Sequence, residues 1–529
     1  MTGSTLAVPQ PLDSTRLRLG ISRLLPWLAP VLTMAVGIFA VDGSPVGAAR
    51  DDSMYVVLAK SLATGHGFRW LNIPGTPAAA HFPPGYPAVL ALLWKLDPAF
   101  PANVVLFKLT NVLFAALAAF AVARLVRHRL DATELSAQVY ALATMIAVPM
   151  LTLATQVMSE PLFLAITIGA LIVAERVAER SDAPARDVVV LALLSSGAAL
   201  VRTHGIALVA AVALVLCMRR RFRHAVLYAC VALAVLLPWQ LWVALHAGLV
   251  PDPMRGNYGS YLSLVADAVR ARGFGLLGAA ALRTAHDIGL IVQYAFAPVG
   301  FAALRIAALV VLAILSGVGA RSLRRRIPVT LAFVAVYVTI VLVWPYTPGR
   351  FVWCVWPLLV LVPLAGVRET MQWSAATSGW RIVRAGLLAA AVAMTCGYVA
   401  YNVAGYRQRS WSTAGYAAYM RPLLVQVATR TPRNALIASE AEGTVYLYTG
   451  REAVPVGSFM ATDYLHPRSP AEYAGAAAMV IDRYHPTAVF VTTGFLRNAM
   501  RDLALARPPR LAVVDSFPGG GLVLVPTAP

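Results

Sequence analysis

Residues 24–55 read LLPWLAPVLTMAVGIFAVDGSPVGAARDDSMY, an apolar run that leads into a polar segment with two adjacent carboxylates. The apolar part, from Leu24 to Val41, follows three arginines and is longer than the hydrophobic region of a typical signal peptide. It therefore predicts an uncleaved membrane anchor. Because charges are costly in hydrocarbon, Asp51 and Asp52 predict an aqueous setting beside this first membrane helix.

The composition of the whole chain predicts a polytopic membrane protein. Of its 529 residues, 59% are hydrophobic and only 13% are charged, and the mean hydropathy is +0.69. A net charge of +20 would suggest a nucleic-acid partner in a soluble chain. Here the arginines stand in short clusters between apolar segments, as the positive-inside rule requires, so we expect no nucleic-acid partner and contact with membrane lipids instead.

The apolar segments of spanning length predict about eleven transmembrane helices. They fall at 24–41, 102–123, 135–155, 161–175, 187–201, 204–218, 225–246, 299–318, 328–346, 351–367 and 385–403. With a cytoplasmic N-terminus, every second connection is arginine-rich, so charge and hydropathy agree. The opposite connections then face outward, among them the first loop, 42–87, and a long segment, 247–290.

The sequence predicts three parts: a cytoplasmic tail at 1–23, a transmembrane domain at 24–403 and an extracytoplasmic domain at 404–529. In the last part the apolar runs shorten to strand length and alternate with helix-like stretches, which is typical of a small α/β domain. The predicted strands are 435–439, 488–493, 511–515 and 522–525, and the predicted helices are 470–484 and 494–506. The four cysteines lie in or beside apolar runs, without disulfide or metal-site spacing.

The candidate site residues lie in outward connections. Asp51 and Asp52 begin a short amphipathic helix that is predicted to lie along the membrane surface. One carboxylate is enough to cap this helix, so the second favours a functional role, such as accepting a proton or holding a cation. His81 is held by a proline-rich run that ends at Pro87. Glu160 is another candidate, although Ser159-Glu160-Pro161 can also simply cap the next helix. Arg202 and Arg350 can bind phosphate, or they can snorkel to the membrane interface.

Outward carboxylates with outward cations fit glycosyl transfer from a polyprenyl-phosphate sugar. A carboxylate deprotonates the acceptor hydroxyl, which attacks the anomeric carbon while cations stabilise the departing phosphate. A transporter or flippase of lipid-linked sugars and a non-catalytic scaffold are the alternatives. Transporters place polar features near the membrane midplane, often in repeats, whereas here they gather at one face.

The residues also resemble a known family. The motifs that carry the resemblance are Asp51-Asp52-Ser53-Met54-Tyr55, Gly65-His66-Gly67, His81-Phe82-Pro83-Pro84-Gly85-Tyr86-Pro87, Met158-Ser159-Glu160-Pro161-Leu162-Phe163, Leu237-Pro238-Trp239 and Arg350-Phe351. Over residues 20–400 the chain is similar to bacterial membrane glycosyltransferases of the GT-C superfamily. The most similar groups are the dolichyl-phosphate-mannose-protein mannosyltransferase-like proteins, including the lipid A aminoarabinose transferase and the lipopolysaccharide-core transferases of rhizobia.

The resemblance implies an inverting transferase at the outer face of a bacterial cytoplasmic membrane. It assigns the catalytic carboxylate to Asp51, with Asp52 as its neighbour, and the donor phosphate to Arg350, Arg202 and His81. The chain departs from the aminoarabinose transferases at Met54, where they have arginine, and at His81-Phe82, where they have lysine before the paired prolines. The resemblance therefore implies the superfamily rather than the aminoarabinose specificity. Glu160 is an acidic partner, a divalent cation is left open, and the acceptor can be a glycan, lipid or protein.

Overall fold

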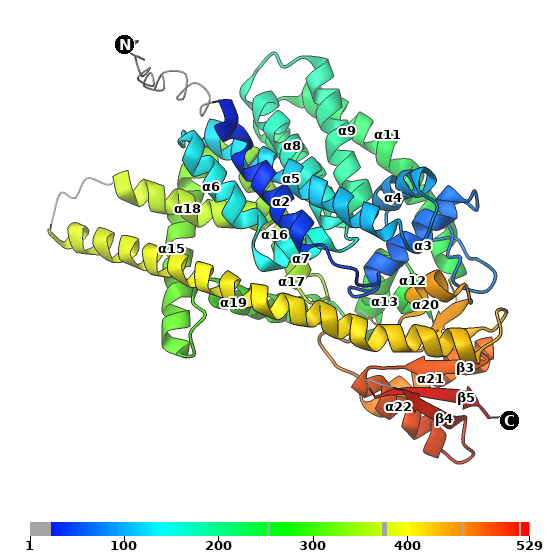
Figure 1. The fold of residues 1–529 in the computed structure, drawn as a ribbon. Coiled ribbons are helices and arrows are strands. Elements are labelled where there is room, and N and C mark those ends of the chain that lie inside the picture. The colour runs from blue at the N-terminus through cyan, green and yellow to red at the C-terminus, as the bar shows by residue number, and fades with distance from the viewer. Residues whose placement is uncertain are drawn as a thin grey trace, which may run out of the picture.

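The computed structural model describes residues 23–250, 254–372, 378–457, 460, 462–517 and 520–527. The predicted cytoplasmic tail lies outside the described residues except for Arg23. The chain is mostly helical, with one small sheet near the C-terminus (Figure 1). This confirms the predicted class of a helical, membrane-type protein with a small C-terminal α/β part.

The helical part runs from η1 to α19. Its elements are η1 (Leu25–Trp27), α2 (Leu28–Ala40), α3 (Asp51–Ala63), α4 (Gly85–Leu96), α5 (Val104–Arg129), α6 (Glu134–Met145), α7 (Val148–Thr155), α8 (Glu160–Glu179), α9 (Ala185–Val201), η2 (Thr203–Gly205), α10 (Ile206–Met218), α11 (Phe222–His246), η3 (Ala247–Leu249), α12 (Arg255–Tyr258), α13 (Tyr261–Arg272), α14 (Gly275–Phe296), α15 (Ala302–Arg326), α16 (Pro328–Leu342), α17 (Gly349–Cys354), α18 (Trp356–Gln372) and α19 (Ser378–Arg430).

The count of eleven spans is not confirmed. Among the described residues, six helices are long and apolar enough to cross a membrane, or seven if α6 and α7, which meet at 68°, form one broken span. Three predicted spans correspond to helices that are apolar but shorter: η1 with α2, η2 with α10, and α16. Conversely, α14 meets the length and hydropathy criteria although the sequence placed most of it in an outer connection.

The C-terminal part is a mixed five-stranded sheet with helices. After α20 (Glu442–Thr449) come α21 (Pro470–Tyr484) and α22 (Gly494–Leu505), and the strands are β1 (Ile437–Ser439), β2 (Ala453–Pro455), β3 (Ala488–Val491), β4 (Leu511–Phe517) and β5 (Gly521–Pro526). The spatial order is β2-β1-β3-β5-β4, with β2, β1 and β3 parallel and the last two antiparallel. Four strands and two helices are confirmed within a few residues. β2 and α20 were missed, because a three-residue strand that ends in proline carries almost no periodic signal.

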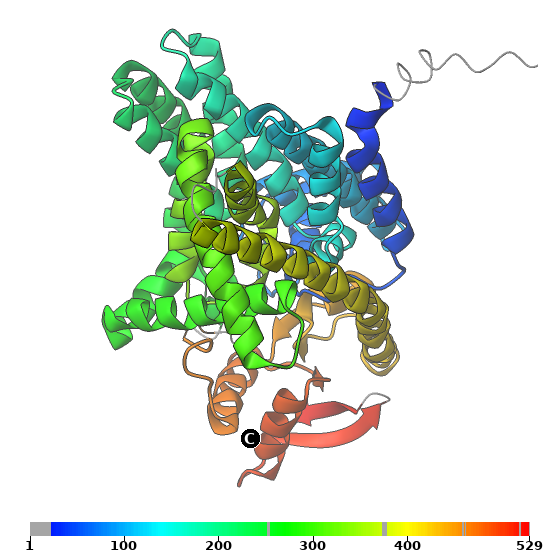
Figure 2. The same ribbon diagram turned by 90° about the vertical axis from the view of Figure 1, so that its left-hand side faces the viewer.

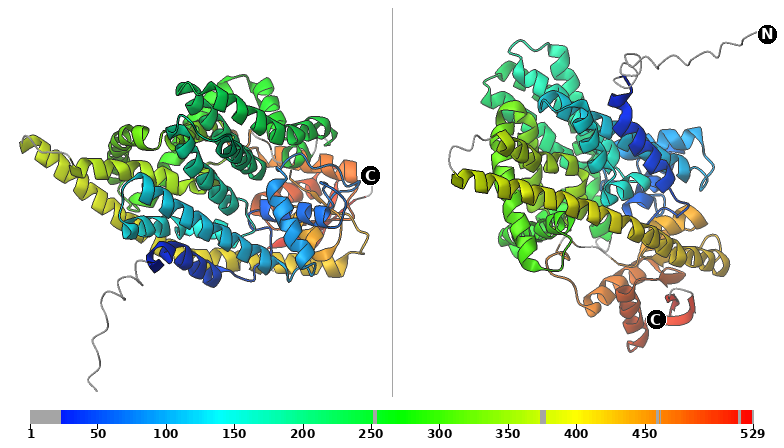
Figure 3. Two further views of the ribbon diagram at one scale, coloured as in Figure 1. Left: turned by 90° about the horizontal axis from the view of Figure 1, so that it is seen from above. Right: turned by 60° about the vertical axis from the view of Figure 1, so that its left-hand side comes forward.

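The long helix α19 joins the two parts. It has 53 residues and runs along the flank of the helical part to the sheet (Figures 1 and 3). It crosses the predicted domain boundary at 403 without a break, packs against α14 and α18 on one side of that boundary, and contacts α20 and β4 on the other. The sheet lies at the opposite end of the molecule from the start of α2 (Figure 2).

Helix α3 differs from the predicted amphipathic surface helix. Nine of its thirteen residues are buried, on all sides of the helix. It packs against α4 and also against α20 of the C-terminal part. The prediction of a helix starting at Asp51 is confirmed, but the predicted amphipathic character is wrong, because the helix is buried on all sides and α20 of the C-terminal part packs against it.

Helices α15 and α18 approach so closely that only glycine fits at the crossing. A Cβ at Gly366 would lie 1.9 Å from the carbonyl oxygen of Leu315, and one at Gly319 would lie 1.9 Å from that of Val362. Small residues allow such backbone contact between membrane helices, where packing rather than the hydrophobic effect drives association.

We expect Gly366→Ala to lower the unfolding free energy by about 1 to 3 kcal/mol, because the two helices must separate to admit the methyl group. The matched control is Gly317→Ala on α15, where nothing lies within 4 Å of the added Cβ. Thermal unfolding of the detergent-solubilised protein measures both. Equal melting temperatures for the two variants would contradict this close approach.

Candidate functional site

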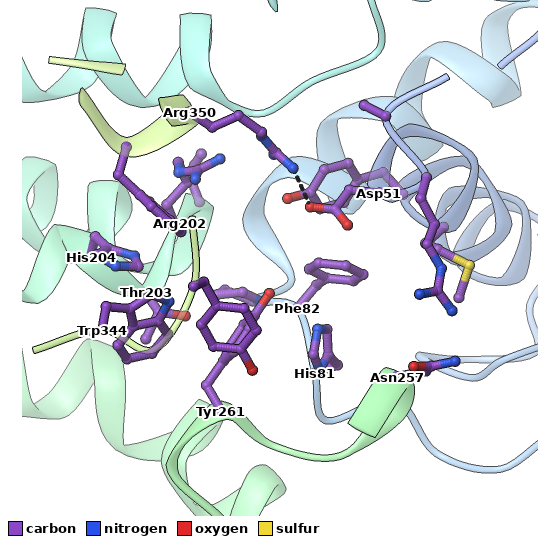
Figure 4. A pocket seen from close by; sticks show the side chains of 18 of the residues that line it. Asp51, His81, Phe82, Arg202, Thr203, His204, Asn257, Tyr261, Trp344 and Arg350 are labelled. Atoms are coloured by element: carbon purple, nitrogen blue, oxygen red, sulfur yellow. Dashed lines mark hydrogen bonds and ion pairs between the residues drawn. The ribbon is translucent and has the colours of Figure 1, made fainter. Parts of the chain in front are cut away.

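A cavity of about 250 Å³ opens at the first residues of α3. Its walls come from the start of α3, the loop before α4, the turn between α9 and α10, α12 with α13, and the segment that leads into α17 (Figure 4). We call it the first cavity. Its lining residues include Asp51, Tyr55, His81, Arg202, Asn257, Tyr261, Trp344 and Arg350. Five segments far apart in sequence thus form one site.

Four charged side chains form a continuous chain of contacts in this cavity. Arg350 Nη1 donates to Asp51 Oδ2 at 2.7 Å, and Arg350 Nη2 and Nε donate to Glu160 Oε1 at 2.7 and 2.9 Å. Arg202 Nη1 lies 2.8 Å from the same Glu160 oxygen. Figure 4 shows Arg350 reaching across the cavity to Asp51. Two cations and two carboxylates therefore balance each other before any ligand enters.

Glu160 is the buried centre of this arrangement. Its side chain is fully buried, whereas those of Asp51 and Arg350 are 29% and 35% exposed. Removing one partner from a buried ion pair leaves an uncompensated charge, which costs about 3 to 5 kcal/mol. Glu160 therefore acts from behind the cavity wall, holding both arginines in place, and the accessible pair is Asp51 with Arg350.

Ser159 does not cap α8 as the sequence suggested. No side-chain cap bond forms at this helix start. Instead, the Ser159 hydroxyl accepts a hydrogen bond from Arg202 Nη1 at 2.9 Å and lies 3.1 Å from the Tyr55 hydroxyl. The serine thus joins α3, α8 and the α9–α10 turn directly beneath the cavity.

Asp52 lies apart from its neighbour Asp51. It is not among the lining residues of the first cavity, and its Oδ2 accepts a hydrogen bond from the Gly47 amide at 2.7 Å. Burial raises the pKa of Asp52 to about 6, although the backbone hydrogen bond from Gly47 opposes this. The two carboxylates therefore have different surroundings and do not face a common ligand.

His81 lines the cavity with a defined tautomer. Its Nδ1 donates to the carbonyl oxygen of Gly259 at 2.6 Å, which leaves Nε2 as an acceptor in the neutral ring. Burial lowers the pKa of His81, and the bond to Gly259 and the charge of Asp51 only partly oppose this. A neutral ring favours hydrogen bonding over a charged contact with phosphate.

The structure brings most of the predicted site residues together. Asp51, Arg350, Arg202 and His81 line one cavity, and Glu160 supports it from behind. The sequence did not indicate Arg50, which lies between the cavity and the C-terminal part and pairs with the buried Glu442 at 2.9 Å. Its position directly before the two aspartates was the only available signal. Aromatic lining residues such as Tyr261 and Trp344 were also missed, since tyrosine and tryptophan are common in membrane proteins.

The sequence left open whether a divalent cation binds at the site, and the structure leaves this question open too. In the part of the chain that the structure describes, no group of three or more His, Cys, Asp or Glu side chains comes together. The guanidinium of Arg350 lies between Asp51 and Glu160, at the place where a cation bridging these two carboxylates would bind.

The fold is similar to that of two crystal structures of ArnT from Cupriavidus metallidurans, in agreement with the fold that the resemblance to the GT-C superfamily predicted. The structure bound to undecaprenyl phosphate has 16% sequence identity and a TM-score of 0.50, over 98% of this chain and 99% of that one. The apo structure has 15% identity and a TM-score of 0.51, over 97% of both chains. No protein-family model and no curated protein sequence matches the chain significantly.

We expect Asp52→Asn to remove a pH dependence of stability. A carboxyl group whose pKa rises from 3.8 to about 6 on folding stabilises the fold fully below about pH 4, and this contribution is lost as the pH rises through 6. The loss amounts to about 3 kcal/mol, at about 1.36 kcal/mol per pKa unit. Asp52→Asn should therefore raise the melting temperature at pH 7 and flatten its change between pH 4 and pH 7. The exposed Asp182→Asn serves as control, and parallel profiles for all three proteins would refute the assignment.

Proposed function

We propose that this protein transfers a sugar from a polyprenyl-phosphate donor to an acceptor hydroxyl at the outer face of a bacterial cytoplasmic membrane. The observation that carries the proposal is the Asp51–Arg350 pair: an accessible carboxylate and an accessible guanidinium, 2.7 Å apart, in one cavity of a GT-C-type fold. One member can accept a proton while the other stabilises a phosphate, which are the two tasks of this reaction. The ArnT structure with undecaprenyl phosphate supports the donor class.

The position of the cavity along α8 supports an outer location. This helix starts at Glu160, beside the cavity, and ends at Glu179, which pairs with Arg129. Its 20 residues, at about 1.5 Å each, span about 30 Å, close to the thickness of the hydrocarbon core. The far end is rich in arginine: Arg219 and Arg221 donate to backbone carbonyls of α8 there. By the positive-inside rule that end is cytoplasmic, which puts the cavity at the outer face.

In the proposed reaction, charge moves between groups that are already in contact. The acceptor oxygen forms a bond to the anomeric carbon as the bond from that carbon to the phosphate oxygen breaks, and its electron pair goes to the phosphate. The acceptor proton passes to Asp51. As Asp51 loses its charge and the phosphate gains one, Arg350 can transfer its hydrogen bond from the carboxylate to the phosphate, with no change in the net charge of the cavity. Attack opposite the leaving phosphate inverts the anomeric carbon.

Arg202 and His81 complete the proposed donor site. Arg202 lines the cavity, is 8% exposed and is held by Glu160 and Ser159, so its positive charge has a fixed place in the cavity wall. His81 offers a neutral Nε2 as a hydrogen-bond acceptor for a sugar hydroxyl. Asp52, which stands behind the wall, positions the start of α3 through Gly47 rather than touching substrate.

We expect Asp51→Asn to lower sugar release from polyprenyl-phosphate donors at least 100-fold, because general-base catalysis contributes about 10²- to 10⁴-fold. The assay uses purified protein in lipid nanodiscs, a panel of radiolabelled polyprenyl-phosphate sugars, and envelope glycans or water as acceptor. The exposed Asp182→Asn should keep the wild-type rate. A chelator arm tests the open question of a divalent cation. Donor binding without turnover in the wild type would instead favour a transporter or a scaffold.

We expect Arg350→Ala to weaken binding of undecaprenyl phosphate about 10- to 100-fold, the loss of one charge-assisted hydrogen bond to phosphate. Arg350→Lys should restore part of the affinity, because the charge remains but the planar fork is lost. Arg220→Ala, at the arginine-rich end of the helices, is the matched control. Titration of the lipid into nanodiscs measures all four proteins, and an unchanged affinity in Arg350→Ala would remove this arginine from the phosphate site.

A further inference from the structure

A second cavity, of about 260 Å³, lies between the C-terminal sheet and α19. Its floor is formed by residues that directly follow the parallel strands: Glu440 after β1, Gly457 shortly after β2, and Thr492 and Thr493 after β3. In α/β sheets, ligands bind in the crevice at the carboxyl ends of the parallel strands. The second cavity therefore lies where this kind of sheet offers a binding site.

Aromatic rings form two walls of the second cavity. Tyr416 and Tyr419 come from α19, with ring centroids 5.3 Å apart. Tyr473 of α21 and Phe495 of α22 come from the sheet side, with centroids 5.1 Å apart. Phe495 is 54% exposed although it is a large apolar side chain. Aromatic faces above polar groups suit a ligand with both apolar C–H faces and hydroxyl groups.

A buried carboxylate supplies an unused hydrogen-bond acceptor. The side chain of Asp463 is 9% exposed and lines the cavity. Its Oδ2 accepts from Arg468 at 2.8 Å, but its buried Oδ1 has no partner among the described residues. A buried acceptor without a donor is destabilising, and a ligand hydroxyl can supply the missing donor.

The charges of the second cavity favour a neutral ligand. Arg468 is paired with Asp463 and stacks over the Tyr473 ring at 4.3 Å. Both oxygens of Glu440 accept hydrogen bonds, from the backbone amides and side chains of Thr492 and Thr493. The cations and carboxylates balance each other, so an anion would find no surplus positive charge.

The two cavities share one residue. Arg50, directly before Asp51, lines both of them, and its guanidinium pairs with Glu442 of α20. The second cavity is therefore adjacent to the first, with Arg50 between them. From the shared wall, the two pairs of aromatic rings and the unsatisfied Asp463 oxygen, we propose that the second cavity binds a sugar residue of a glycan acceptor. Its role as an acceptor subsite rests on the proposed function, whereas sugar binding itself does not.

Saturation-transfer-difference NMR tests this site without turnover. The probes are the methyl glycosides of glucose, galactose, mannose and arabinose, added to the full-length protein in nanodiscs, with empty nanodiscs as blank. We expect at least one glycoside to receive saturation from the protein. Its saturation-transfer signal should fall at least fivefold in Tyr419→Ala and in Phe495→Ala. Leu505→Ala, an 80% exposed residue of the same helix α22 as Phe495, is the matched control and should keep the signal.

The outcomes separate the two proposals. Absence of a signal above the blank for all four glycosides, or a signal that Tyr419→Ala and Phe495→Ala leave unchanged, overturns the second site. Inorganic phosphate, titrated in the same samples, should not compete with the glycoside. Competition would show that the second cavity binds an anion and not a sugar. Failure of the donor assay with intact glycoside binding would refute the proposed transfer and leave the sugar site standing.

Discussion

The burial of Glu160 between two arginines is the constraint on which the site depends. One oxygen of this carboxylate receives both guanidinium groups, at 2.7 and 2.8 Å, and no part of the side chain reaches solvent. Each partner comes from a different segment: α8, the turn after α9, and α17. Since a buried carboxylate without its partners is strongly destabilising, these segments must meet at one point for the chain to fold. The pairing that joins these segments at one end of the helices thereby also aims Arg350 at Asp51.

A second polar network connects this end to the C-terminal part. The buried Glu442 of α20 receives Arg50 at 2.9 Å and the Tyr258 hydroxyl at 3.0 Å, and Asn72 donates to that hydroxyl at 3.0 Å. The backbone carbonyl of Asn72 accepts a hydrogen bond from the Ala453 amide of β2, and the Asn72 side-chain Nδ2 donates to the Ala453 carbonyl at 3.3 Å. The first loop is thus held from both sides, by the helices at Asp51 and by the sheet at Asn72. This explains why α3, which follows Arg50 in an unfavourable backbone conformation with φ of 62°, is buried on all sides.

The sequence predicted the parts of the molecule that repeat a local pattern. Apolar runs revealed the long helices, and alternating short runs revealed β1, β3, β4 and β5, because periodic burial leaves a local signal. It also placed Asp51, Arg202, Glu160 and Arg350 on one side of the membrane. The sequence could not show that Glu160 and Asp52 both lie behind the cavity wall. Adjacent residues on a helix point about 100° apart, and only the neighbouring segments decide which of them faces the cavity. Helix α14 was missed because its mean hydropathy, 1.2, is the lowest of the six candidate spans.

The unequal burial of the two arginines suggests a division of tasks. Arg202 is held by Glu160 and Ser159 and is almost fully buried, so its place is fixed before and after a ligand binds. Arg350 bridges Glu160 and Asp51 and is the more exposed of the two. Because Glu160 still accepts two of its hydrogen bonds, Arg350 can release Asp51 without leaving the site. A carboxylate whose accessible partner is movable becomes free to accept a proton when a phosphate draws that partner away. Donor binding would in this way activate the proposed base, so that the base is available only when there is a sugar to transfer.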